Sequence, residues 1–102
     1  MENARQACVV MITAASQDEA RSLARLLVEE RLAACVQILP AMQSLYVWQG
    51  STEQSDEILL LVKTTLDVFS HLEETVKARH SYDTPEIIAF LSSLRPPLIC
   101  HG

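Results

Sequence analysis

The side chains best suited to chemistry are gathered in one short segment, residues 80–86. It reads His80-Ser81-Tyr82-Asp83-Thr84-Pro85-Glu86 and offers an imidazole, a phenol and two carboxylates. An imidazole together with carboxylates can bind Cu or Zn. The alternative is a structural loop, with His80 favoured by the dipole at a helix C-terminus and an Asx-type turn after it. The residue types alone favour the loop and leave the metal site open.

Two further side chains, Lys63 and Trp48, are candidates for a binding pocket. Lys63 directly follows five aliphatic residues. It is either a charge that protects a strand edge or a cation at the rim of a pocket. Trp48 alternates with Tyr46 on one strand face, where it either packs or forms the aromatic wall of a small-molecule pocket. The acidic residues at positions 53, 56 and 57 are expected to be solvated.

Signals for enzymatic chemistry and for a polyanionic partner are absent from the sequence. It contains only two glycines, Gly50 and Gly102, and therefore no glycine-rich phosphate-binding loop. Neither H-E-x-x-H nor G-x-S-x-G occurs. The net charge of −5 argues against binding to nucleic acid or to an anionic membrane surface. We therefore expect a protein that is not an enzyme.

The composition is that of one small globular domain. The chain has 102 residues, of which 49% are hydrophobic, and its longest apolar runs are too short to insert into a membrane. Its N-terminus is polar and lacks the apolar core of a secretory signal. The three cysteines share no metal-ligand spacing. These features together predict a cytoplasmic protein.

The hydrophobic pattern predicts an α+β fold. Ser16 and Glu19 have the spacing of a helix capping box, and Pro40 marks a strand edge or a bulge. The expected elements are a strand over 8–13, a helix after Ser16, a strand over 34–39 that resumes over 44–49, a connection over 50–54, a strand over 56–65, a helix ending near His80 and a strand over 86–91. This β-α-β-β-α-β order is the ferredoxin-like sandwich, with both helices on one face of an antiparallel sheet.

The hairpin between the second and third strands is long for so small a domain. Ten extended residues over 56–65 span about 33 Å, whereas a domain of this size has a radius of gyration of about 13 Å. Such a hairpin would cross the whole domain, and its aliphatic run over 58–62 would need cover on both faces. The simplest cover is another copy of the chain, on the sheet face that the helices leave bare.

Four ordered sequence blocks resemble the CutA family of divalent-cation tolerance proteins. The blocks are Glu30-x-Leu32-Ala33-Ala34-Cys35-Val36, Ser44-Leu45-Tyr46-x-Trp48-x-Gly50, Glu57 through Thr65, and His80-x-Tyr82-x-Thr84-Pro85-Glu86-Ile87-Ile88. The resemblance extends from about Val9 to Ala89. It implies a homotrimer of ferredoxin-like subunits, similar in build to PII signalling proteins, in which long strands pair across subunits. It also implies binding of copper or other divalent cations and a role in metal tolerance.

The family's metal ligands are only partly present. The resemblance places a first-strand cysteine at Ile12 and an adjacent histidine pair at Arg79-His80, so that only His80 remains. Cys8 lies four residues earlier, about 13 Å along a strand, and cannot replace the missing thiol. We therefore expect weak copper binding at His80 or none.

The resemblance also divides the chain and suggests a ligand cleft. Residues 1–6 form a tail, residues 7–91 the CutA-like domain, and residues 92–102 a C-terminal tail atypical of the family. The leading hypothesis is a trimeric protein of divalent-metal homeostasis, with clefts between subunits lined by Lys63, His80, Tyr82, Glu86 and Trp48. One alternative is a PII-like sensor whose clefts bind a small anionic metabolite. The other is a structural scaffold with empty clefts.

Overall fold

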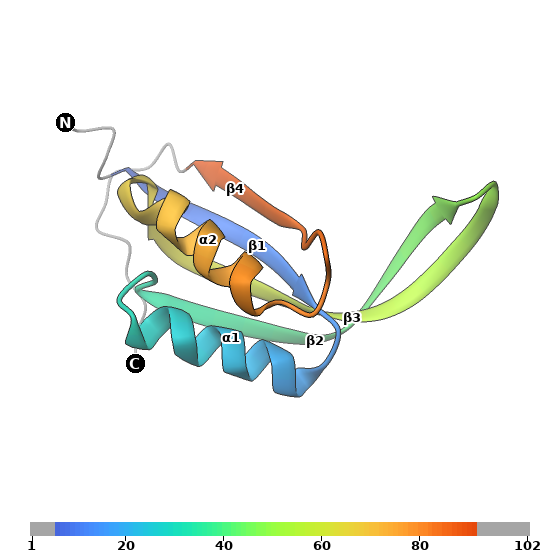
Figure 1. Ribbon diagram of the computed structural model, residues 1–102, viewed down its shortest axis with the longest axis horizontal. Coiled ribbons are helices and arrows are strands. Elements are labelled where there is room, and N and C mark those ends of the chain that lie inside the picture. Colours follow the sequence, from blue (N-terminus) through green and yellow to red (C-terminus); the bar gives the residue numbers. More distant parts are fainter. Residues whose placement is uncertain (1–5, 92–102) are drawn as a thin grey trace.

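The computed structural model describes residues 6–91 of the chain (Figure 1). The elements are β1 (Ala7–Ala14), α1 (Gln17–Glu29), β2 (Cys35–Trp48), β3 (Ser51–Thr65), the 3-10 turn η2 (Leu66–Val68), α2 (Phe69–Arg79) and β4 (Ile87–Leu91). This is the predicted element order. Apart from Gln6, the predicted tails over 1–6 and 92–102 lie outside the described residues.

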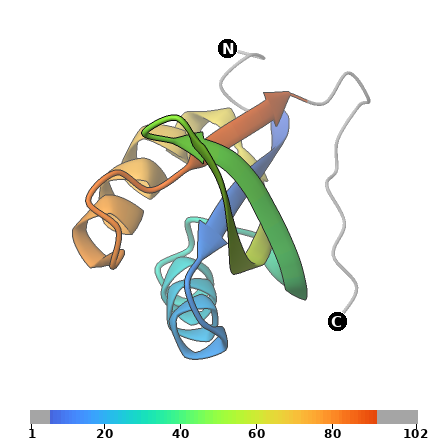
Figure 2. The same ribbon diagram turned by 90° about the vertical axis from the view of Figure 1, so that its right-hand side faces the viewer.

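The four strands form one antiparallel sheet in the order β2-β3-β1-β4. Both helices pack on the same face of this sheet, as Figures 1 and 2 show. Alternate residues of β1 and β3 point toward the helices, because successive side chains of a strand lie on opposite faces. The core between sheet and helices includes Cys8, Val10, Ile12, Leu23, Leu27, Leu60, Val62, Leu72 and Val76, each at most 2% exposed.

The opposite face of the sheet is mostly apolar and carries no described element. Met11 lies between Leu61 and Ile88 in the strand register, and Val9 lies next to Phe90. These side chains point away from the helices because their neighbours in sequence fill the core. The exposed fractions, 40% for Ile88 and 53% for Phe90, are high for large apolar side chains in a sheet. We call this the uncovered face.

The β2–β3 hairpin is longer than predicted and has a tighter turn. The expected connection over 50–54 is wrong, because β3 already begins at Ser51 and the turn consists of Gln49 and Gly50. Both have positive φ angles, 51° and 81°, which is characteristic of a type I′ hairpin turn. The polar residues after Gly50 join the strand because they pair with β2. Residues 42–57, the hairpin arm, project beyond the helices, and the molecule measures 46 × 25 × 24 Å (Figure 1).

Pro40 occupies both positions that the sequence left open, an edge strand and a bulge. The pairing of β2 with β3 shifts between Leu39 and Met42, and Ala41 has a φ of 64°. β2 lies at the edge of the sheet, where the missing N–H of Pro40 interrupts no inner ladder. The bulge separates the sheet under the helices from the hairpin arm.

The ends of the helices follow from local sequence. Ser16 caps α1, and its Oγ accepts a hydrogen bond from the Glu19 backbone N–H at 3.1 Å. The Glu19 carboxylate reaches back to the Ala15 N–H, one residue before the position of the standard capping box. α2 ends at Arg79 with His80 as its C-cap, as predicted. This cap places His80 at the start of the loop over 80–86, which we call the α2–β4 loop.

Candidate functional site

His80 is fixed beneath the α2–β4 loop by both of its ring nitrogens. Nδ1 lies 3.0 Å from the backbone N of Tyr82, and Nε2 lies 2.6 Å from the carbonyl oxygen of Thr13 in β1. A backbone N–H can only donate, so Nδ1 must accept. A carbonyl can only accept, so Nε2 carries the proton. The side chain is fully buried, and its ring lies 4.7 Å from the ring of Tyr82, centroid to centroid.

Glu19 ties the same loop to the start of α1. One carboxylate oxygen accepts from the Ser81 backbone N–H at 2.7 Å, and the other accepts from the Ser81 hydroxyl and the Ala15 N–H, both at 3.0 Å. Burial opposes ionisation of this carboxyl, but the hydrogen bonds from Ala15 and Ser81 lower its pKa. Glu19 is therefore an ionised anchor of the loop.

Tyr82 extends the contacts from the loop to the hairpin arm. Its hydroxyl donates to Glu57 in β3 at 2.9 Å, and the Ser44 hydroxyl in β2 donates to the other Glu57 oxygen at 2.5 Å. Burial, and then the hydrogen bond and charge of Glu57, raise the pKa of Tyr82 to about 12. The expectation that Glu57 is solvated is wrong, since its carboxylate is partly buried and accepts two hydrogen bonds.

A hollow of about 650 Å³ opens beside Tyr82 at the base of the arm. Its lining residues come from the arm and from the α2–β4 loop: Ser44, Leu45, Tyr46, Ser55, Glu57, Tyr82 and Glu86. They include two carboxylates and no basic side chain. The structure therefore brings together Tyr82 and Glu86 of the predicted cleft, and adds Glu57, Ser44 and Tyr46.

Lys63 and Trp48 lie away from this hollow in opposite directions. Lys63 is six residues along β3 from Glu57, or about 20 Å. Trp48 is two residues beyond Tyr46, which lines the hollow. Lys63 sits on β3, an inner strand, so the interpretation that it protects an edge is wrong. It lies on the uncovered face, because the side chain of Thr64 beside it points inward to the carbonyl of Leu32. Trp48 is at the tip of the arm and is 61% exposed.

The residues of one subunit do not fit a copper site at His80. Neither ring nitrogen has a free lone pair, because one accepts a hydrogen bond and the other carries a proton. Among residues 6–91, no three side chains of the types His, Cys, Asp and Glu are grouped closely enough to hold an ion. Cys8 is buried, and burial with the nearby charge of Asp67 raises its pKa, which disfavours the metal-binding thiolate. Ile12, at the family's cysteine position, is buried in the core.

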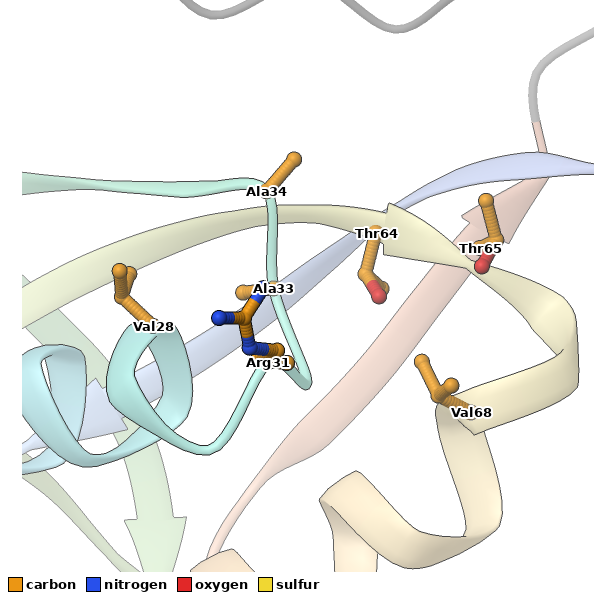
Figure 3. Close-up of a pocket in the computed structure, with 7 residues that line it drawn as sticks. All are labelled: Val28, Arg31, Ala33, Ala34, Thr64, Thr65 and Val68. Atoms are coloured by element: carbon orange, nitrogen blue, oxygen red, sulfur yellow. The ribbon is translucent and has the colours of Figure 1, made fainter.

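A second hollow lies at the other end of the helices (Figure 3). It has a volume of about 380 Å³, and Arg31 is the one charged residue among the seven that line it. The Thr64 hydroxyl at its wall is already engaged with the Leu32 carbonyl. None of the predicted site residues lines this hollow.

The comparison with known proteins decides the family. Residues 8–94 match the family described as CutA1 divalent ion tolerance protein. The chain belongs to this family. It is 56% identical to the divalent-cation tolerance protein CutA of Thermus thermophilus over 81 residues, which is 79% of either chain.

Solved structures of CutA proteins have the same fold. The CutA1 structure from Thermus thermophilus superimposes with a TM-score of 0.84 at 50% identity, over 88% of this chain and 87% of that one. CutA from Archaeoglobus fulgidus, described as periplasmic, gives a TM-score of 0.83 at 39% identity over 88% and 87%. In the part of this CutA-family chain that the structure describes, neither helix is long and apolar enough to span a membrane.

Sequence analysis identified the loop of this site but not the residues that hold it in place. Glu19, Thr13 and Glu57 lie 62, 67 and 25 residues from the loop residues that they contact. No local spacing could join them to the loop. The one signal available was Glu19, whose capping-box position held its carboxylate at the N-terminus of α1.

Proposed function

We propose that this chain is a non-enzymatic, homotrimeric protein of divalent-cation tolerance, and that any copper it binds is held weakly. Membership of the family supports the link to divalent cations, because its members are named for tolerance of these ions. The observation that carries the assembly is the uncovered apolar face, together with a hairpin arm that projects from the subunit.

The physical chemistry of the arm supports a partner. A two-stranded hairpin alone in water is marginally stable. Yet the arm exposes four large apolar side chains in succession, Leu45, Tyr46, Val47 and Trp48, at 46% to 72%. Its strand β2 is also an edge with unpaired backbone groups, which can pair with another copy. The number of three subunits comes from the resemblance to the family.

The hollow beside Tyr82 would become a cleft between subunits in such an assembly. Lys63 is too far away in the same subunit, so it could line that cleft only from a neighbouring copy, whereas Trp48 lies two residues beyond Tyr46, which lines the hollow. Glu57 and Glu86 would give the cleft an acidic wall suited to a cation. Since one subunit supplies no group of three ligands within residues 6–91, a tight metal site would need side chains from two copies.

The alternative is a PII-like sensor of a small anionic metabolite. Lys63 favours it, because its positive charge lies on the uncovered face where a partner would enclose it. An empty scaffold is the third hypothesis. The cytoplasmic location remains a prediction, since the Archaeoglobus relative is described as periplasmic.

Native mass spectrometry of metal-stripped protein, before and after stoichiometric Cu(II), tests the proposal. We expect a trimer and little retained copper. A monomer at micromolar concentration would contradict the assembly, and copper retained at one ion per subunit would contradict weak binding.

A thermal-shift screen separates the ligand classes, because a true ligand stabilises the folded state by mass action. Divalent cations should raise the melting temperature if the cleft is acidic, and anionic metabolites should do so if Lys63 dominates. Glu86→Gln should reduce a cation shift, while the matched control Glu74→Gln on the exposed side of α2 should not. No shift with any ligand would favour the scaffold.

A further inference from the structure

The hydrogen bonds of His80 connect β1 to the wall of the hollow. Thr13 at the end of β1 accepts from Nε2, and Nδ1 accepts from the backbone N–H of Tyr82. The hydroxyl of the same Tyr82 then donates to Glu57 in the arm. The imidazole is thus the middle member of a continuous series of contacts across three elements.

We propose that His80 is a positioning residue that is locked as the Nε2–H tautomer, holds Tyr82 on Glu57, and does not ligate metal. This inference concerns one subunit and holds for any oligomeric state. It departs from the family-based expectation of a histidine ligand at this position.

A metal ion at either nitrogen would have to displace an existing bond. At Nδ1 it would compete with the Tyr82 N–H, which would then be left without its acceptor. At Nε2 it would have to remove the proton that binds the Thr13 carbonyl. Each lost bond would leave a desolvated polar group, which is unfavourable, and the fully buried ring offers no open approach.

The contact with Tyr82 has the form of an Asx turn, in which a side chain accepts from the backbone N–H two residues later. This allows two substitutions that separate the two nitrogens. His80→Asn retains an acceptor near Nδ1 and loses the donor. His80→Gln retains a donor near Nε2 and loses the acceptor. A role in positioning Tyr82 predicts that only the Gln variant releases the loop.

The first test uses the unaltered protein and the imidazole ¹⁵N resonances of its histidines, with His80 assigned from the His80→Asn variant. We expect the pattern of a neutral Nε2–H ring, unchanged by excess Zn²⁺, which is a diamagnetic probe. A proton on Nδ1, or a saturable shift of the His80 nitrogens with Zn²⁺, would overturn the proposal.

The second test compares the two variants. Amide exchange of Tyr82 should accelerate about tenfold in His80→Gln, as expected for one lost hydrogen bond, and should change little in His80→Asn. Tyr82→Phe should shift the unfolding equilibrium in wild type and in His80→Asn, but much less in His80→Gln, where the Glu57 contact is already lost. If Tyr82→Phe had the same effect on stability in His80→Gln as in His80→Asn, His80 would be merely structural and the positioning role would be refuted.

Discussion

Glu19 joins the N-terminus of α1 to the α2–β4 loop through an ionised carboxylate. Its pKa is below the ordinary value of 4.5 despite burial, because backbone and hydroxyl donors from Ala15 and Ser81 stabilise the charge. The ionised form therefore stabilises the fold above that ordinary value. This stabilisation is lost as the pH falls through the lower pKa of the folded state.

Replacing this carboxylate should cost stability at neutral pH and little in acid. Glu19→Gln should lose about 1–2 kcal/mol at pH 7, since its hydrogen bonds to a charged group are weakened. The difference from wild type should shrink as the pH falls. Urea unfolding at fixed protein concentration measures both effects. Glu29→Gln, on an exposed side chain of the same helix, should change stability by less than about 0.5 kcal/mol; an equal loss there would refute the anchor role of Glu19.

Tyr82 should titrate far into the alkaline range. Its pKa of about 12 lies above the ordinary value of 10.0, so the folded state keeps a proton that the unfolded state releases. Stability should therefore fall as the pH rises from about 10 to about 12. In a Tyr46→Phe background Tyr82 is the one remaining tyrosine, and phenolate absorbance reports it directly.

Glu57→Gln should lower this pKa only part of the way. Burial is its largest cause and would persist, whereas the charge and hydrogen bonding of Glu57 would be reduced. Glu53→Gln, an exposed carboxylate on the same strand, is the control and should leave the titration unchanged. An unchanged titration in Glu57→Gln would show that Tyr82 does not contact Glu57.

At the scale of elements, the end of α1 combines a standard motif with an unusual residue. Arg31 N–H binds the carbonyl of Val28, and Leu32 N–H binds that of Leu27, which is the Schellman pattern. The motif needs a left-handed residue, normally glycine, and Arg31 has a φ of 62°. A side chain in this region costs roughly 1 kcal/mol.

Arg31→Gly should therefore stabilise the protein, by about 0.5–1 kcal/mol. Arg21→Gly is the matched control in the interior of α1, where glycine should destabilise by about 1 kcal/mol. Thermal or urea unfolding should give opposite signs for the same chemical change. Loss of stability in both variants would mean that Arg31 makes a contribution greater than its strain.

An element could be predicted where the residues that determine it are close together in the sequence. The strands around Val10 and Leu60, the stripe of α1 and the cap at Ser16 follow from apolar spacing and short side-chain contacts. The two-residue turn was missed because residues 51–55 are polar and resemble a loop. These residues form a strand because they pair with β2, and sequence spacing does not reveal that pairing. The contacts of Glu57 escaped prediction for the same reason.

At the scale of the whole molecule, the uncovered face is the surface through which the proposed assembly would form. Phe90→Lys should prevent association, because a lysine packed against an apolar partner would be a buried, unpaired charge. Native mass spectrometry should detect monomers of this variant, while its helical circular dichroism should remain. Val28→Lys, at a 43% exposed position on the helical side, is the control and should assemble normally. A Phe90→Lys protein that still assembles would place the interface elsewhere.

The projecting arm has a kinetic consequence. The sheet beneath the helices can form within one chain, a first-order process, whereas in the proposed assembly the arm becomes ordered only when chains collide. Refolding should therefore show a late phase whose half-time shortens as protein is added. In a cell that makes few copies, each new chain would spend longer with Val47 and Trp48 in contact with water. In the proposed assembly, the length of the hairpin thus makes the speed of maturation depend on the rate of synthesis.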